Sequence, residues 1–150
     1  MSDMAPDFTL PSTTGEDITL SALRPALVVL FFYPRDDTSG CTVENLDFTA
    51  LLPEFEAAGV KFFGISKDSM ASHEKFMAKK SLTVPLLSDE TDTVCEAYGV
   101  WKEKKMYGKT FMGIERSTFL IDGEGRIAKE WRKVKVPDHA AEVLAAAKAL

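Results

Sequence analysis

One cysteine stands where a strand, a loop and a helix are expected to meet. Residues 34–40 form a polar loop after a continuously apolar run, and Cys41 then opens a pattern typical of a helix. Amide groups and the dipole at a helix N-terminus favour an anion, so this position favours the thiolate form of Cys41. The thiolate is the nucleophilic form of cysteine. The polar flanks therefore indicate a reactive thiol rather than a small apolar core residue.

The neighbours of this cysteine fit such chemistry. Gly40 lets backbone amides approach the sulfur closely, and Pro34 stiffens the loop and shields the thiolate from solvent. Thr38 lies three residues before the cysteine, and its hydroxyl can both donate and accept a hydrogen bond. Glu44 falls in the first helical turn. It could take part in the site, or it could be a solvated carboxylate that the helix dipole favours at this position.

Strand and helix patterns alternate around this loop. Such alternation predicts an α/β fold, with a mixed central sheet and helices on both faces, in a single domain over residues 1–150. In open α/β sheets, sites lie at the carboxyl ends of strands, which is where Cys41 follows a buried strand. The predicted strands are 8–10, 18–20, 27–33, 60–65, 117–121 and 126–131, and residues 84–87 are expected to be extended. The predicted helices are 41–58, 66–81, 92–98 and 137–150. Pro53 is expected to split or bend the first of these helices.

Composition limits the function classes. Hydrophobic residues make up 45% and charged residues 27% of the chain, and the net charge is −5. This weakly acidic balance argues against nucleic acid as a partner, and the cluster Lys102, Lys104 and Lys105 is expected to be a solvated stretch. The first ten residues have neither a basic start nor a long apolar run, so we expect no signal peptide, no membrane segment and a cytoplasmic location. Both cysteines would stay reduced there.

Several motifs, in order along most of the chain, resemble the peroxiredoxins, and within them the bacterioferritin-comigratory protein or PrxQ subfamily. The spacing Pro-x-x-x-Thr-x-x-Cys, at Pro34, Thr38 and Cys41, matches the active-site signature of that family. The other matching segments are APDF at 5–8, FFYP at 31–34, GCTVE at 40–44, GIS at 64–66 and GIERSTFLID at 113–122.

This resemblance implies a thioredoxin-like fold and a redox-active cysteine. Cys41 would be the peroxidatic residue, which reduces hydrogen peroxide and organic hydroperoxides through a sulfenic acid. Arg116 matches the family's active-site arginine, and together with Thr38 it would stabilise charge on the departing oxygen. Glu44 would hold loop groups or Arg116. No cofactor is implied, and two cysteines and two histidines show no metal-ligand spacing.

The sequence departs from the subfamily at the resolving cysteine. Five residues after the peroxidatic position the chain has Leu46, and the alternative position in the next helix is Met77. Ser39 replaces a frequent proline. Cys95 is expected to be a buried helix thiol, with a resolving role as the alternative. We therefore expect a one-cysteine enzyme that thioredoxin, glutaredoxin or a small thiol reduces, and the sequence leaves monomer and homodimer open.

Other functions fit these residues less well. A thiol–disulfide oxidoreductase would normally show Cys-x-x-Cys, and a hydrolase that uses Cys41 would need a nearby base. His73 and His139 are both expected to be exposed rather than catalytic. A non-enzymatic binding module on the same fold is the alternative from another class. Its exposed patch or dimer surface would use apolar residues that more often line a core or pocket, namely Trp101, Tyr107, Phe111 and Met112.

Overall fold

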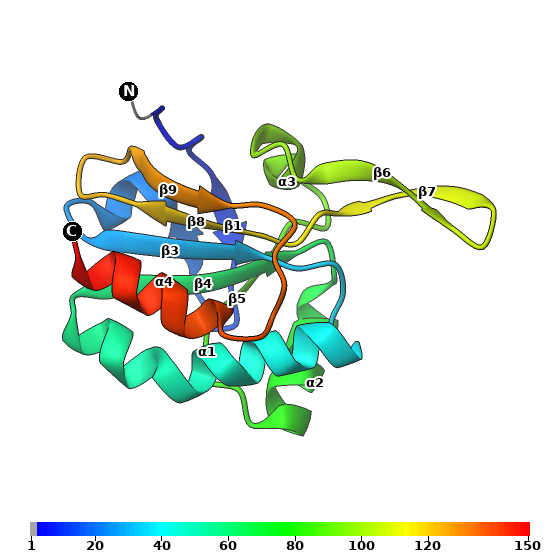
Figure 1. Cartoon of the computed structure of the whole chain (residues 1–150), viewed down its shortest axis with the longest axis horizontal. Coiled ribbons are helices and arrows are strands. Elements are labelled where there is room, and N and C mark those ends of the chain that lie inside the picture. The colour runs from blue at the N-terminus through cyan, green and yellow to red at the C-terminus, as the bar shows by residue number, and fades with distance from the viewer. Residues whose placement is uncertain (1–2) are drawn as a thin grey trace.

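Five strands form the central sheet of the structure, a computed structural model that describes residues 3–150 (Figure 1). Their order across the sheet is β5-β4-β3-β8-β9. β3 pairs in parallel with β4 and antiparallel with β8, so the sheet is mixed, as predicted. The strands are β3 (Leu27–Phe32), β4 (Val60–Ser66), β5 (Leu86–Ser88), β8 (Ser117–Ile121) and β9 (Ile127–Trp131).

Helices cover both faces of this sheet, which confirms the predicted architecture (Figure 1). One face carries α1, α2 and α4, and the other carries α3, the 3-10 turn η1 and the hairpin β1–β2. No helix within residues 3–150 is both long and apolar enough to cross a membrane. The bounds are β1 (Thr9–Pro11), β2 (Asp17–Thr19), η1 (Leu20–Leu23), α1 (Ser39–Ala57), α2 (Met70–Lys80), α3 (Val94–Ala97) and α4 (His139–Lys148).

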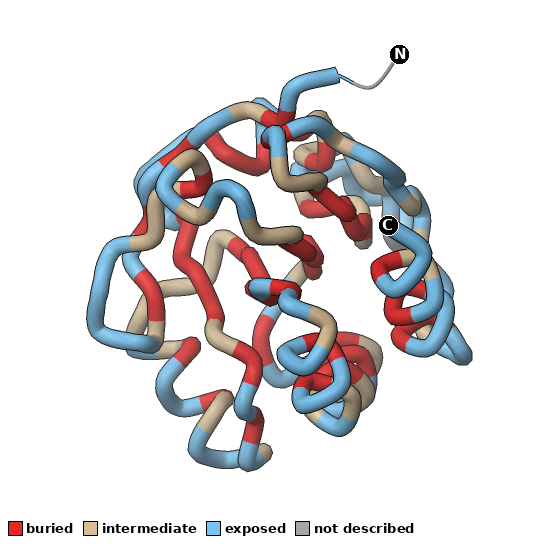
Figure 2. Tube along the Cα trace, turned by 90° about the vertical axis from the view of Figure 1, so that its left-hand side faces the viewer, coloured by how far each residue is buried: buried red, intermediate tan, exposed pale blue. Residues whose placement is uncertain are grey.

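The central strand β3 divides the interior into two apolar cores. Successive side chains of a strand point to opposite faces, so Phe31 packs beneath α1 while Phe32 packs toward α3. Figure 2 shows buried residues along the central strands and on the inner sides of the helices. A strand buried on both faces must be apolar throughout, which is why the run at 27–33 was readable as a core strand.

A second hairpin projects from the body of the molecule and was not predicted (Figure 1). Its strands β6 (Trp101–Met106) and β7 (Lys109–Ile114) form a two-stranded sheet of their own. Tyr107 and Gly108 make the turn with φ values of 53° and 75°, the positive values that a tight hairpin turn needs. The expectation that the apolar residues here line a core is wrong for three of them: Tyr107 is 97%, Phe111 43% and Met112 50% exposed.

Pro53 does not split the segment in which it lies. α1 runs from Ser39 to Ala57 with the proline inside. A proline within a helix costs about 3 kcal/mol, because one backbone hydrogen bond is lost and the ring crowds the preceding turn. Phe48 and Phe55, on either side of Pro53, are fully buried against the sheet. Burial of these two rings offsets the cost and keeps the helix continuous.

Candidate active site

The helix α1 begins at the carboxyl end of β3 and places Cys41 in its first turn. The residue before the helix, Thr38, is extended with φ −87° and ψ 156°, and its carbonyl accepts the N–H of Thr42 at 2.8 Å. The first N–H groups of a helix have no intrahelical partners, so the dipole and these amides face the sulfur region. Cys41 is itself fully buried, with 0% of its surface exposed.

Arg116 reaches the sulfur although 75 residues separate it from Cys41. The register between β3 and β8 explains this approach, because Phe32 pairs with Ser117. The residue before Ser117 therefore lies beside the end of β3, where the loop that leads to α1 and Cys41 begins. From there the guanidinium Nη2 donates a hydrogen bond to Cys41 Sγ at 3.3 Å. A Cβ at Gly40 would stand 3.2 Å from that nitrogen, so the glycine leaves room for the arginine.

Glu44 holds the other branch of the same guanidinium. Arg116 Nη1 lies 2.5 Å from Glu44 Oε1, and the carboxylate is almost fully buried. Burial raises the pKa of Glu44 from 4.5 to about 7, because it outweighs the attraction of Arg116. For Arg116, burial lowers the pKa, but the charges of Glu44 and Cys41 raise it overall. One planar group thus bridges the sulfur and a buried carboxylate.

Thr38 does not cap the helix with its side chain. Its hydroxyl donates to the Arg35 carbonyl at 3.0 Å instead, and the residue is exposed at the mouth of the loop. The hydroxyl oxygen keeps its lone pairs and can accept a hydrogen bond from a substrate. The structure therefore brings Cys41, Arg116 and Glu44 into contact and leaves Thr38 beside them on the solvent side.

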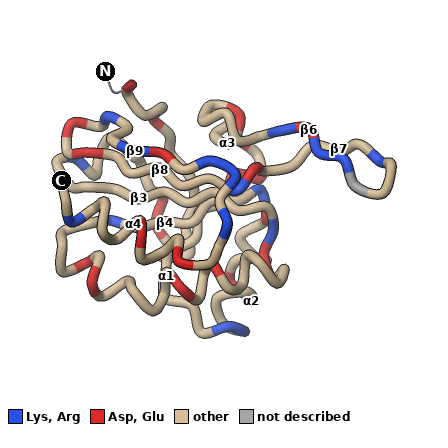
Figure 3. Tube along the Cα trace, viewed as in Figure 1, with Lys and Arg blue, Asp and Glu red and all other residues tan. Residues whose placement is uncertain are grey.

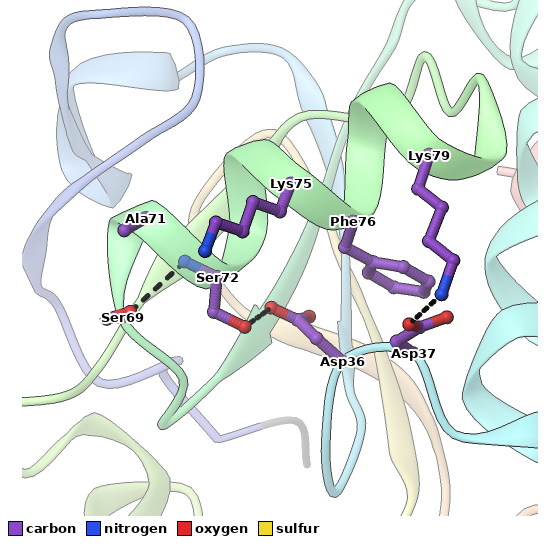
Figure 4. Close-up of a pocket in the computed structure, with 8 residues that line it drawn as sticks. All are labelled: Asp36, Asp37, Ser69, Ala71, Ser72, Lys75, Phe76 and Lys79. Carbon is purple, nitrogen blue, oxygen red and sulfur yellow. Dashed lines mark hydrogen bonds and ion pairs between the residues drawn. The ribbon is translucent and has the colours of Figure 1, made fainter.

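A buried carboxylate ties this loop to α2, and the sequence did not indicate it. Asp36 Oδ1 accepts the Tyr33 hydroxyl at 2.6 Å, while Oδ2 accepts the Ser72 hydroxyl and faces His73 Nδ1, both at 2.8 Å. Asp36 also donates its backbone N–H to Asp68 at 2.8 Å. Figure 4 shows Asp36 and Ser72 at one side of a pocket of about 470 Å³ between the loop and α2.

The same cluster contains the residues of this site that could hold a metal ion. Asp36, Asp68 and His73 place one ligand atom each within 4.8 Å of one another. These atoms already form hydrogen bonds with one another or with neighbouring hydroxyls, which accounts for the cluster as a structural anchor.

Both histidines are buried, so the expectation that they are exposed is wrong. The ring of His73 lies between the Asp36 carboxylate and the Leu87 carbonyl, 2.9 Å from Nε2. His139 Nε2 lies 2.8 Å from the Thr118 hydroxyl, and burial lowers the pKa of this histidine. These partners, rather than polar neighbours in sequence, hold the two rings inside. Among the described residues, the hydrogen bond to Cys41 Sγ comes from Arg116.

Cys95 lies on the opposite face of the sheet. It belongs to α3 and packs in the core with Phe32 and Tyr98, whereas Cys41 packs in the core beneath α1. Its backbone N–H donates to Asp89 Oδ2 at 2.8 Å. Burial, followed by the Asp89 carboxylate, raises the pKa of the Cys95 thiol far above its ordinary value. The two sulfurs are therefore separated by the central sheet.

Comparisons with known proteins point to one family. The pattern of the AhpC/TSA family matches residues 1–130. Peroxiredoxin Bcp of Xanthomonas campestris is 52% identical over 143 residues, which cover 95% of this chain and 89% of that protein, and Peroxiredoxin Bcp of Escherichia coli is 41% identical, covering 91% and 88%. These names agree with the resemblance that the motifs indicated.

Solved structures agree in fold as well. A structure of the Xanthomonas campestris bacterioferritin comigratory protein, which concerns alkyl peroxide reduction, has a TM-score of 0.89 at 51% identity and covers 95% of this chain and 90% of its own. A Cys-to-Ser mutant of Xylella fastidiosa PrxQ has a TM-score of 0.90 at 42% identity, covering 99% and 97%.

Proposed function

This chain belongs to the AhpC/TSA family and is a peroxiredoxin, a thiol-dependent peroxidase, and on that premise we propose that Cys41 reduces hydrogen peroxide and organic hydroperoxides. The observation that carries the proposal is the hydrogen bond from Arg116 Nη2 to Cys41 Sγ at 3.3 Å. A guanidinium so placed stabilises the thiolate before reaction and faces the oxygen atoms during it.

The reaction is a displacement at oxygen. The Cys41 thiolate attacks one oxygen of ROOH, the S–O bond forms as the O–O bond breaks, and the alkoxide that leaves takes a proton to give ROH. Negative charge moves from sulfur to the leaving oxygen, and Arg116 lies close enough to follow it. Glu44 is a positioning residue that holds the guanidinium, and Thr38 accepts a hydrogen bond from the peroxide.

The cysteine sulfenic acid then needs a second thiol from outside the chain. Leu46 and Met77 occupy the positions of the subfamily's resolving cysteines, and Cys95 lies across the sheet from Cys41. These observations favour a one-cysteine cycle, completed by thioredoxin, glutaredoxin or a small thiol. The proposal places the reaction in the cytoplasm, with residues 1–150 acting as one thioredoxin-like domain.

The test is the intact mass of the reduced protein after one equivalent of hydroperoxide, without added reductant. A gain of one oxygen on Cys41 is the expected result. A loss of two hydrogens within one chain would mean a Cys41–Cys95 disulfide and would make Cys95 the resolving residue. No rapid change of mass would contradict the peroxidase role of Cys41 and favour a binding module on this fold.

A further inference from the structure

The hairpin β6–β7 carries positive charge in a protein that is negative overall. Residues 101–114 include four lysines and one glutamate, whereas the whole chain has a net charge of −5. Figure 3 shows these lysines along the projecting arm. An isolated two-stranded hairpin is marginally stable in water, and this one also exposes 43% of Phe111. A projecting hairpin that is both charged and partly apolar is a candidate surface for contact with another molecule.

The two faces of the hairpin differ in charge. Directly paired residues of an antiparallel ladder share a face, so the pairs Lys104–Phe111 and Lys102–Gly113 lie on one side together with Lys109. The single acid, Glu103, pairs with Met112 on the other side. The first face is therefore basic and aromatic and contains no acidic residue.

The basic face looks toward the Cys41 side of the molecule. β7, which carries part of this face, ends at Ile114, two residues before Arg116. Burial, and then Arg116, lower the pKa of Lys104, while Cys41 and Glu115 raise it by less. The opposite face begins at Trp101, over which the Lys67 ammonium stands at 5.2 Å, and Lys67 pairs with Asp89 on the Cys95 side. The basic face of the hairpin is thus on the Cys41 side, and the face that begins at Trp101 is on the Cys95 side.

A second basic segment lies beside Arg116. Val134 donates its N–H to the Arg116 carbonyl at 3.0 Å, whereas the neighbouring Arg132 turns to the Cys95 side, over the ring of Phe119. Lys133 and Lys135 are exposed here, on the segment between β9 and α4 that is also blue in Figure 3. A depression of about 400 Å³ lies between these lysines and the start of α4, and Glu142 of that helix also lines it.

We propose that this basic rim, defined as Lys102, Lys104, Lys109, Lys133 and Lys135, is the docking surface for an acidic protein that supplies the resolving thiol. The inference rests on the proposed one-cysteine cycle, in which the second thiol must come from outside. Charge complementarity selects an acidic partner surface, and the rim borders the arginine that contacts Cys41.

Docking brings a thiol of the partner to the oxidised Cys41, where a thiol–disulfide exchange sequence regenerates the enzyme. A thiolate of the partner attacks the Cys41 sulfur of the sulfenic acid, the S–O bond breaks, and hydroxide leaves as water after it takes one proton. The mixed disulfide is then attacked by the second thiol of the partner, which releases Cys41 as a thiolate. Overall, ROOH and a dithiol give ROH, water and the disulfide of the partner.

The experiment compares two matched variants, Lys109→Glu on the basic face and Lys105→Glu on the opposite face, one rung away. Peroxide reduction is driven either by a thioredoxin of net negative charge or by uncharged dithiothreitol. We expect Lys109→Glu to lower kcat/KM for the thioredoxin by about fivefold and to weaken its salt dependence, because rim charges act on association. Lys105→Glu should stay within about twofold of the unchanged protein, and dithiothreitol-driven rates should be unaffected by either change.

A Lys133→Glu variant tests the second segment and should show the same selective loss. Equal rates for Lys109→Glu and Lys105→Glu would overturn the proposal. So would turnover with dithiothreitol but with neither an acidic thioredoxin nor an acidic glutaredoxin. Co-sedimentation with phosphatidylglycerol vesicles that Lys109→Glu abolishes, without any change of thioredoxin kinetics, would assign the rim to membranes instead. Lack of turnover with dithiothreitol would overturn the proposed function itself, and the docking role with it.

Discussion

The two cysteines of this chain are equally buried and differ in nearly everything else. Both side chains have 0% exposure, and each lies in a helix. Cys41 receives a hydrogen bond from a guanidinium, whereas Cys95 lies beside the buried Asp89 carboxylate, which together with burial raises the pKa of its thiol. One environment is built for a sulfur anion and the other opposes it.

This difference shows that burial alone does not decide whether a cysteine is inert. The deciding quantity is the sign of the charge that the fold places next to the sulfur. Arg116 comes to Cys41 through the β3–β8 register, and Asp89 comes to Cys95 because its carboxylate accepts the backbone N–H groups of Val94 and Cys95 at the start of α3. The same sheet that separates the two sulfurs assigns them opposite chemistry.

Replacing each cysteine by serine should give the largest contrast. We expect Cys41→Ser to lower dithiothreitol-driven hydroperoxide consumption by at least about 10³-fold, because the nucleophile is lost. Cys95→Ser should remain within about twofold. Peroxide consumption is followed directly for both variants. A comparable loss in Cys95→Ser, together with an intramolecular disulfide in the unchanged protein, would show that the sheet does not keep the sulfurs apart.

Removing the charge beside Cys41 should have the next largest effect. We expect Arg116→Ala to slow sulfenic acid formation by about 10²–10³-fold, the usual cost of a preorganised donor, while the fold stays intact. Arg116→Lys should recover only part of this, because lysine keeps the charge but cannot bridge Cys41 and Glu44. Stopped-flow measurement at substoichiometric peroxide gives both rates. An unchanged rate in Arg116→Ala would remove the arginine from the mechanism.

Alkylation at pH 8 should separate the cysteines without any substitution. Cys95 stays protonated there because burial, with the Asp89 carboxylate, raises its pKa, whereas Cys41 receives a hydrogen bond from Arg116. Both sulfurs are fully buried, so each must be exposed by local opening before it reacts. We expect iodoacetamide to modify it about 100-fold more slowly than Cys41. Peptide mass mapping gives the two rates, and the difference should vanish in denaturant. Equal rates in the folded protein would contradict the contrast drawn above.

The smallest effect concerns Glu44 and the pH dependence of stability. Its folded pKa of about 7 exceeds its ordinary value of 4.5, so the folded state keeps a proton that the unfolded chain releases. Its contribution to the free energy of unfolding is therefore largest below pH 4.5 and is lost as pH rises to about 7. Glu44→Gln should reduce the fall in stability between pH 5 and 8 by roughly 1–3 kcal/mol, measured by urea unfolding. An equal fall in both proteins would contradict the raised pKa.

Local sequence patterns predicted the strands that are mostly buried. β3, β4 and β8 were predicted as strands because most of their side chains are apolar, and the polar loop before Cys41 contrasts with them. The hairpin β6–β7 was missed for the opposite reason. Its strands are rich in lysine rather than β-branched residues, and its turn is Tyr107-Gly108 instead of the more usual Asn-Gly or Asp-Gly.

Local sequence patterns predicted only part of the candidate site. Cys41 and Gly40 followed from local pattern, but Arg116 entered through a family resemblance, since only strand register brings it near the sulfur. Asp36 and His73 were missed because a hydrogen bond across 37 residues leaves no periodic signal. Buried polar groups are defined by partners in space, which a single sequence does not display.

The carboxylate of Asp36 also limits how readily the loop before Cys41 opens. It joins the loop before Cys41 to Tyr33, Ser72 and His73, so the loop can unwind only when several buried hydrogen bonds break together. While the loop stays closed, the oxidised sulfur that we propose for Cys41 stays buried beside Arg116, out of reach of a protein thiol. We therefore expect the strength of this anchor to influence how soon a partner repairs the sulfenic acid and how often a second peroxide oxidises it further.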